Sequence, residues 1–301
     1  MADITEVTNG LQFPEGPIAM DDGSVVLVEI KRQTLTRVLP DGTQQVIAEL
    51  GGGPNGAAIG PDGKCYVCNN GGFEWSEMNG LTLPGEQPAD YESGSIQRVD
   101  LETGAVETLY RECDGNPLRG PNDIGFDKQG GFWFTDLGKT RARDQDRGSV
   151  YYATPDGQSI KEVIYPLATP NGIGLSPDES MLYVAETQTG RVHHYALSAP
   201  GEAAPADLLG GTLLAGLPGM QLFDSLAIDS EGNVCVATLV NGGITSISPD
   251  GETITHFPTP DLLTTNICFG GPDLRTAFIT LSGTGKLVST IWDVPGLKLN
   301  F

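Results

Sequence analysis

The sequence is short of positive charge and of long apolar runs. Its 301 residues contain 17 lysines and arginines against 39 aspartates and glutamates, a formal charge of −22. So acidic a surface repels phosphate backbones, and we therefore expect no nucleic-acid partner. No apolar run reaches the roughly 18 residues that a membrane helix needs, and the first thirty residues lack a basic, apolar export signal. We expect no membrane association and a cytoplasmic location.

Histidine and paired cysteines are also scarce. Only three histidines occur, and none of them is one of the six repeated polar residues described below. A Ser-His-Asp triad at those residues would therefore lack its base. Five cysteines include one close pair, Cys65 and Cys68, with no second pair at zinc-ligand spacing. Residues three apart on a strand point to opposite faces, so these two thiols should diverge and act as small buried side chains.

What the sequence has in abundance is turn residues and an internal repeat. Its 41 glycines and 21 prolines favour many short strands joined by tight turns. Six stretches share a polar residue, a short apolar run, a turn and a strongly apolar strand, and they follow one another at intervals of 40 to 67 residues. Such intervals are typical of β-propeller blades. We call the six polar residues the anchors: Glu15, Asn55, Asn122, Asn171, Asp224 and Asn266.

The rest of each repeat predicts how the ring is closed. Two further alternating runs, joined by an Asp-Gly or Thr-Gly turn, give four strands per unit. The sixth unit supplies only three strands, whereas residues 4–7 form a strand-like run before the first anchor. We therefore predict a single all-β domain, residues 1–301, folded as a six-bladed β-propeller with four-stranded blades. The N-terminal strand closes the last blade, so that only short, protected edges remain.

The anchors predict a metal site. The first strand of each blade lines the central channel, and because every anchor precedes that strand, all six should converge at one mouth. Carboxylate and amide oxygens are hard ligands, suited to calcium and less well to magnesium or manganese. Turn capping explains the Asn-Gly pairs at Asn55 and Asn171. It does not explain an oxygen-bearing side chain at the same place in all six units.

A second polar ring and an insertion are expected at the same mouth. Fourteen residues after five anchors, and fifteen after the other, stand Glu29, Asn69, Asp136, Glu186, Thr238 and Thr280. The longest unit carries its extra length after the second strand, as NNGGFEWSEMNGLTLPGEQPADYESGS over residues 69–95. A long, irregular, aromatic segment there is typical of a substrate lid, and a solvated surface excursion is the alternative.

Five stretches resemble the SMP-30/gluconolactonase/luciferin-regenerating family. They are the Glu15-Gly-Pro opening, GPNDIGFDKQGGFWFTD, PNGIGLSPDESMLYVAET, DSLAIDSEGNVCVA and TTNICFGGPDLRTAFIT. The resemblance runs from about residue 11 to residue 281. It implies a six-bladed propeller with one catalytic divalent metal, usually calcium, with zinc, manganese or iron in some members.

Carried over position by position, the resemblance implies metal ligands at Glu15, Asn122, Asn171 and Asp224. It also implies that Asp224 is the general base or nucleophile of lactone hydrolysis. Sugar-acid lactonases of the family typically have an arginine two residues before the asparagine that matches Asn122. Here Gly120 takes that place, and the arginine is displaced to Arg119. We therefore expect a less polar or ring-bearing lactone, contacted by Asn55, Phe73, Trp75, Arg119, Asp136 and Asn266.

The predicted function is a divalent-metal-dependent hydrolase that opens a lactone to a hydroxy acid. The metal polarises the carbonyl, and Asp224 either deprotonates the attacking water or attacks the carbonyl itself. One alternative is a metal-dependent phosphotriester or aryl-ester hydrolase on the same site. The other is a propeller that binds a small ligand without turnover, because propellers host many non-catalytic roles. The sequence indicates neither the metal's identity nor the oligomeric state.

Overall fold

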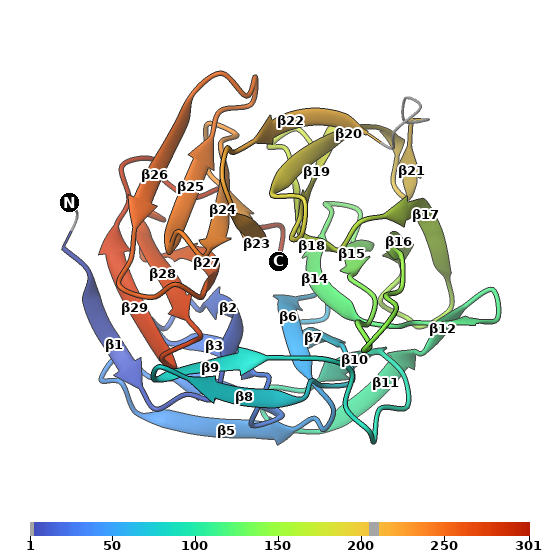
Figure 1. Cartoon of the computed structure of the whole chain (residues 1–301), viewed down its shortest axis with the longest axis horizontal. Coiled ribbons are helices and arrows are strands. Elements are labelled where there is room, and N and C mark those ends of the chain that lie inside the picture. Colours follow the sequence, from blue (N-terminus) through green and yellow to red (C-terminus); the bar gives the residue numbers. More distant parts are fainter. Residues whose placement is uncertain (1–2, 205–210) are drawn as a thin grey trace.

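The structure, a computed structural model, describes residues 3–204 and 211–301, and over these residues the chain is built from strands without a helix. Consequently no described helix is long and apolar enough to cross a membrane. Six antiparallel sheets are arranged around a central axis (Figure 1). The prediction of a six-bladed β-propeller is confirmed.

Within each blade, strands follow one another from the axis outward. Blade 1 comprises β2 (Pro14–Ala19), β3 (Val25–Glu29), β4 (Thr34–Val38) and β5 (Gln44–Glu49). Blade 2 comprises β6 (Pro54–Ile59), β7 (Cys65–Asn69), β10 (Ser95–Val99) and β11 (Val106–Tyr110). Blade 3 comprises β14 (Pro121–Phe126), β15 (Phe132–Asp136), β16 (Gly148–Ala153) and β17 (Ile160–Leu167). Blade 4 comprises β18 (Pro170–Leu175), β19 (Met181–Glu186), β20 (Arg191–Ala199) and β22 (Thr212–Gly216), and the short strand β21 (Glu202–Ala203) also pairs with β20. Blade 5 comprises β23 (Leu222–Ile228), β24 (Val234–Leu239), β25 (Gly243–Ile247) and β26 (Ile254–Pro258). Two small hairpins, β8 (Trp75–Met78) with β9 (Leu81–Pro84) and β12 (Glu112–Cys113) with β13 (Asn116–Pro117), lie outside the blades.

The last blade is closed by the N-terminal strand, as predicted. Blade 6 consists of β27 (Thr264–Gly270), β28 (Thr276–Leu281), β29 (Lys286–Ile291) and β1 (Thr5–Asn9). β1 runs antiparallel to β29, with Thr5 opposite Ser289 and Asn9 opposite Lys286. The closing strand begins and ends slightly later than the predicted 4–7, and an ion pair of 2.7 Å between Lys286 and Glu6 supports it. The first and last strands of the described chain are thus joined in one sheet.

The apolar core lies between adjacent blades, and the cysteines belong to it. Cys65 packs with Val28 and other buried residues of blades 1 and 2. Cys68 packs with Phe134 and other residues of blades 2 and 3. The two thiols therefore diverge across β7, as predicted, and all five cysteines are free.

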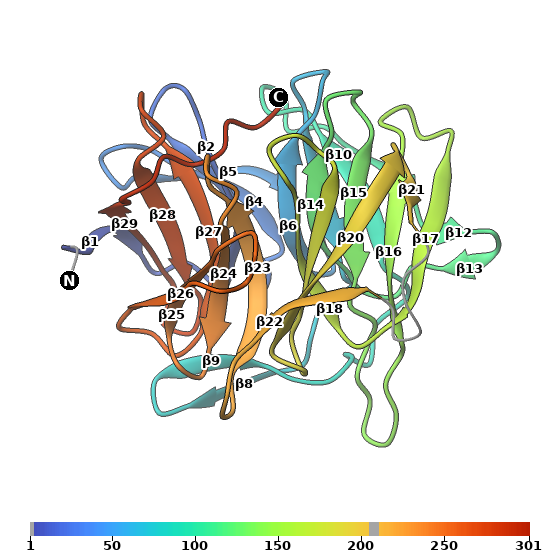
Figure 2. The ribbon, with the colours of Figure 1, turned by 90° about the horizontal axis from the view of Figure 1, so that it is seen from above.

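The two faces of the propeller differ in what covers them. The C-terminal residues cross the mouth where the inner strands end: Leu297 N–H donates to the Ile228 carbonyl at 2.9 Å, and the Asn300 amide donates to the Phe126 carbonyl at 3.0 Å. Figure 2 shows this segment on the face opposite the β8–β9 hairpin. The anchors lie at the other mouth, on the face that carries β8 and β9.

Candidate metal centre and active site

The six anchors lie at the start of the six inner strands. They are the second or third residue of β2, β6, β14, β18, β23 and β27, so they belong to these strands instead of preceding them as expected. Five of the side chains are buried, whereas that of Asp224 is partly exposed. Partial exposure at a channel mouth is what a group that meets substrate and water requires.

Glycines directly after three anchors bring neighbouring inner strands together. A Cβ atom on Gly16 would lie 2.6 Å from the Asn55 carbonyl oxygen. A Cβ atom on Gly56 would lie 2.3 Å from the carbonyl oxygen of Asn122, the anchor of the next blade. Since real Cβ atoms do not approach backbone so closely, only glycine permits this spacing, and the anchors of adjacent blades become neighbours.

Glu15 is fixed by hydrogen bonds that end on one of its carboxylate oxygens. Its Oε2 accepts from the Gly16 N–H at 2.8 Å and from the Asn266 amide at 2.8 Å. The Asn266 oxygen accepts instead from the Ile267 N–H at 2.7 Å. Asn266 therefore holds Glu15 in place across the junction between blades 1 and 6.

Asn171 makes a second contact across a blade junction, with the residue next to Asp224. The Asn171 amide donates to the Thr187 hydroxyl at 3.0 Å, and its Oδ1 accepts from the Ser225 hydroxyl at 3.4 Å. The Asn171 side chain also favours the ionised form of the Asp224 carboxyl. The Asp224 carboxylate accepts from the Ser225 N–H at 3.1 Å. Three of the predicted metal ligands, Glu15, Asn171 and Asp224, therefore lie close enough for Glu15 and Asn171 to influence the charge of Asp224.

Burial and mutual repulsion disfavour the ionised carboxylates of this group. Burial raises the pKa of Glu15 to about 7, against the hydrogen bonds from Asn266 and Gly16. Burial, followed by the repulsion from Glu15, raises the pKa of Asp224 well above its usual range. Like charges held together away from water cost free energy unless a cation compensates them.

Asn122 supplies an independent indication of a cation. Its Oδ1 atom is buried, and within the described residues no group donates a hydrogen bond to it. Leaving a buried acceptor unpaired costs about 1–3 kcal/mol, so a positive partner at this place would be favourable. The described residues contain no cluster of three or more His, Cys, Asp and Glu side chains able to hold a metal. A site here must therefore use asparagine oxygens, as the four predicted ligands do, and this donor set fits a hard divalent cation.

Asp123, next to Asn122, is a third carboxyl at the ring, and it is buried. Its oxygens accept from the Ile124 N–H at 3.1 Å and the Ile173 N–H at 3.3 Å, on blades 3 and 4. Burial, with repulsion from Glu15 as a lesser cause, raises the pKa of Asp123 to about 7. Asp123 thus joins two inner strands beneath the anchors and adds to the negative potential there.

The second polar ring is buried and supports the loops that lead into the inner strands. Asp136 accepts from the Arg119 N–H at 2.7 Å, the Gly120 N–H at 2.6 Å and the Gly138 N–H at 2.9 Å. Similarly, Glu29 accepts from the Gln12 N–H at 2.7 Å. Because these carboxylates satisfy backbone donors of the entering loops, they position the anchors. A contact between Asp136 and substrate stays a prediction.

The insertion lies on the anchor face, along one side of the mouth (Figure 1). It contacts blade 6 through the Thr82 N–H, which donates to the Gly283 carbonyl at 2.9 Å, and blade 3 through the Gln87 N–H, which donates to the Thr140 carbonyl at 2.9 Å. Lys31 of blade 1 pairs with Glu77 at 2.7 Å. The insertion therefore spans four blades and is part of the folded structure, not a solvated excursion.

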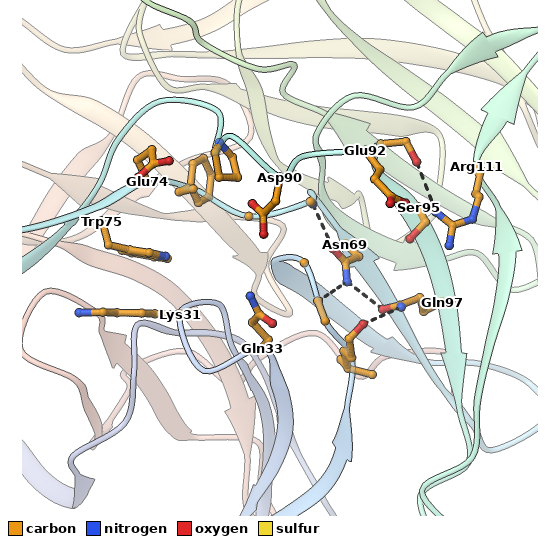
Figure 3. Close-up of a pocket in the computed structure, with 18 residues that line it drawn as sticks. Lys31, Gln33, Asn69, Glu74, Trp75, Asp90, Glu92, Ser95, Gln97 and Arg111 are labelled. Carbon is orange, nitrogen blue, oxygen red and sulfur yellow. Dashed lines mark hydrogen bonds between the residues drawn. The ribbon is translucent and has the colours of Figure 1, made fainter.

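Phe73 and Trp75 line a cavity beneath this insertion (Figure 3). The cavity has a volume of about 500 Å³ and lies between blades 1 and 2, with Lys31, Asn69 and Asp90 among its lining residues. None of the described residues that line it is an anchor. The Trp75 ring also packs against the rings of Phe13 and Phe73, with centroids 5.1 and 5.9 Å apart. Contact of Phe73 and Trp75 with substrate stays a prediction.

Sequence reasoning missed two buried polar residues near the mouth. Lys139, in the loop after β15, is only 1 % exposed, and Asn70 is 2 % exposed. No repeat pattern marks them, because both lie in segments that are particular to one blade. The predicted Arg119 side chain is exposed, whereas its backbone N–H is held by Asp136.

Comparisons with known proteins agree with this fold. A family profile described as "SMP-30/Gluconolactonase/LRE-like region" matches residues 13–283. The chain is 27% identical over 310 residues to a gluconolactonase of Zymomonas mobilis, covering 93% of this chain and 79% of that protein. It is 32% identical over 255 residues to lactonase drp35 of Staphylococcus saprophyticus, covering 83% of this chain and 71% of that protein.

Solved structures show the same fold at lower identity. The gluconolactonase XC5397 of Xanthomonas campestris superposes with a TM-score of 0.76 at 23% identity, covering 96% of this chain and 89% of that one. The calcium-binding protein regucalcin of Agrobacterium tumefaciens gives a TM-score of 0.76 at 19% identity, covering 99% and 98%. With the profile match over nearly the whole chain, this protein belongs to the SMP-30/gluconolactonase/LRE-like family.

Proposed function

We propose that this protein is a divalent-metal-dependent lactonase, which adds water to an intramolecular ester and releases a hydroxy acid. The observation that carries the proposal is the anchor ring itself. It brings together two carboxylates that repel each other and a buried asparagine oxygen to which no group of the described residues donates. The relatives named gluconolactonase and lactonase support the same reaction class.

Glu15, Asn122, Asn171 and Asp224 would hold the cation, with calcium as the first expectation. Their oxygens suit it, and the structural neighbour regucalcin is described as calcium-binding. A bound divalent cation supplies Lewis-acid polarisation of an ester carbonyl and lowers the pKa of water. The asparagines leave more of the cation's charge uncompensated than carboxylates would. Asn266 keeps Glu15 oriented, through the hydrogen bond described above.

Asp224 is the proposed base. Asp224 is the anchor that is partly exposed, so water can reach it, and its carboxylate form can accept a proton. Asp224 takes a proton from the attacking water, the water oxygen bonds to the carbonyl carbon, and the ring C–O bond breaks. The leaving oxygen then receives the proton. In the alternative route, the Asp224 carboxylate attacks first and water hydrolyses the resulting acyl-enzyme. A single turnover in ¹⁸O-labelled water tests the second route, because label in Asp224 requires an acyl-enzyme that water attacks at the Asp224 carboxyl carbon.

The substrate class is expected to be a less polar or ring-bearing lactone. Gly120 occupies the place of the family's substrate-gripping arginine, and it has no side chain that could bind sugar hydroxyls. The test is proton release from a panel of sugar-derived and aromatic lactones, with phosphotriesters and aryl esters as competing classes. Turnover confined to lactones, and faster on the aromatic ones, supports the proposal. Turnover of phosphotriesters without lactone turnover contradicts it.

A further inference from the structure

A buried lysine connects the insertion to blade 3. Lys139 follows β15, and its Nζ donates to the Gly72 carbonyl at 2.5 Å and to the Asn70 Oδ1 at 3.4 Å. Lysine is almost never fully buried unless its charge is paired, yet Lys139 is only 1 % exposed. A structural role must therefore offset the cost of removing this ammonium group from water.

Two aromatic rings complete the environment of this ammonium group. The Nζ atom of Lys139 lies 4.2 Å from the centre of the Phe73 ring and 5.4 Å from that of Tyr91. Both distances are in the range of cation–π attraction, which strengthens when the cation is desolvated. Phe73 stands near the start of the insertion and Tyr91 near its end. One side chain of blade 3 thus binds both ends of the segment.

The same contacts reach the loops that lead to two anchors. Gly72 packs on Gly53, where a Cβ atom would lie 2.6 Å from the Gly72 nitrogen, and Gly53 is two residues before Asn55. The Tyr91 hydroxyl donates to the Arg119 carbonyl at 2.6 Å, three residues before Asn122. The position of the insertion is therefore mechanically linked to the blade 2 and blade 3 parts of the ring.

We propose that Lys139 is a clamp that fixes the insertion as one wall of the anchor mouth, and that it is thereby a positioning residue for substrate. The clamp itself rests on contacts in the structure, whereas its effect on substrate rests on the proposed lactonase function. Lys139 does not touch the reacting atoms in this account. It acts through Gly72, Phe73 and Tyr91.

The charge on the clamp is sensitive to pH. Burial lowers the pKa of Lys139 to about 7, against the attraction of Asp136 on β15 and Asp146 in the adjoining loop. Burial also raises the pKa of Tyr91 to about 12, so its hydroxyl is neutral when the lysine titrates. As the pH rises through 7, Lys139 loses its proton, and the cation–π attraction and the charge-assisted hydrogen bonds weaken.

Hydrogen exchange of residues 70–94 tests the clamp without reference to activity. Lys139→Met keeps the length of the side chain and removes its charge, and we expect exchange in the insertion to rise on the order of tenfold or more. Lys139→Arg should restore part of the protection. The control is Lys128→Met, because Lys128 is exposed in the turn after β14. Wild-type protection, corrected for the intrinsic exchange rate, should fall between pH 6 and pH 8.5, whereas Lys139→Met should show no such fall. Unchanged protection in Lys139→Met would overturn the proposal.

Kinetics on a lactone substrate then separate the two proposals. A positioning role predicts a higher KM in Lys139→Met, with kcat within about threefold and partial rescue by Lys139→Arg. Faster exchange in the insertion of Lys139→Met, in a protein that turns over no lactone, would support the clamp and contradict the lactonase function. Lactone turnover together with unchanged exchange in Lys139→Met would support the lactonase function and contradict the clamp. If Lys139→Met does not fold, Phe73→Leu removes one aromatic partner, and protection equal to wild type would then contradict the clamp.

Discussion

At the scale of single residues, the site is defined by charges that lack compensation. Burial raises the pKa values of Glu15, Asp123 and Asp224, and repulsion from Glu15 raises those of the two aspartates further. The four other anchors are asparagines, which provide oxygens without charge. A divalent cation is the simplest partner that satisfies such a group, because it compensates two negative charges at once.

Asp224→Asn tests the proposed base. The carboxamide keeps the shape of the side chain but cannot accept the proton of the attacking water, so turnover should fall by about 10²-fold or more. Proton release on the best lactone of the panel measures this effect. Asp293→Asn, an exposed aspartate in blade 6, is the matched control and should retain full activity. Wild-type turnover in Asp224→Asn would contradict the assignment, whereas loss of turnover with ligand affinity retained would support it.

Glu15→Gln tests the cost of the buried charge. The folded state raises the pKa of Glu15 from 4.5 to about 7, so metal-free protein loses stability as the pH rises through this range. Glutamine removes that loss. At pH 8 without metal the variant should be more stable than wild type, by at most about 3 kcal/mol, and at pH 4 the two should be similar. Urea unfolding at both values measures the difference. A variant that is less stable at pH 8 would count against this account.

At the scale of strands, the spacing of the ring depends on glycine. Gly56→Ala would place a methyl group against the backbone of Asn122, and we expect a loss of about 3 kcal/mol or more, together with weaker cation binding. Gly125→Ala, in the neighbouring inner strand β14, is the control. Nothing lies within 4 Å of the added Cβ there, so stability should change by less than about 1 kcal/mol. Chemical unfolding and calorimetric calcium titration measure both variants, and equal effects would argue against close packing of the inner strands.

The strands also show which parts of the site could be predicted. Each anchor and its partner fourteen or fifteen residues later recur because every blade repeats the same antiparallel pair, so both rings could be predicted from residue spacing. The structural role of the second ring could not be predicted in this way. Asp136 reads as a polar residue at the mouth, but its oxygens accept three backbone N–H groups of loops whose path only the folded chain reveals.

The contacts of the insertion could not be inferred from pattern. Lys139 lies in a loop that no other blade shares, and its partners Asn70, Gly72 and Phe73 are more than sixty residues earlier in the chain. A single sequence carries no signal for such a pairing. The aromatic residues of the insertion predicted a substrate surface, but gave no sign that the Phe73 ring also contacts this lysine.

At the scale of the whole molecule, ring closure joins the first and last strands. The deletion of residues 1–9 removes β1, exposes the edge of β29 and breaks the ion pair between Glu6 and Lys286. We expect a loss of several kcal/mol and a melting temperature lower by on the order of 10 °C. Differential scanning calorimetry measures this change. An unchanged melting temperature would show that the ring does not depend on the closing strand.

The most direct test of the central claim is the recovery of lactone turnover as cation is added back to chelator-treated protein. We expect no turnover in the chelated protein. Turnover should return with added calcium or another hard divalent cation and saturate at one ion per chain. Asn122→Leu should recover little, because it lacks the ring oxygen that no donor reaches in the described part of the chain. Full turnover in the chelated protein would contradict a metal-dependent reaction at the anchor ring.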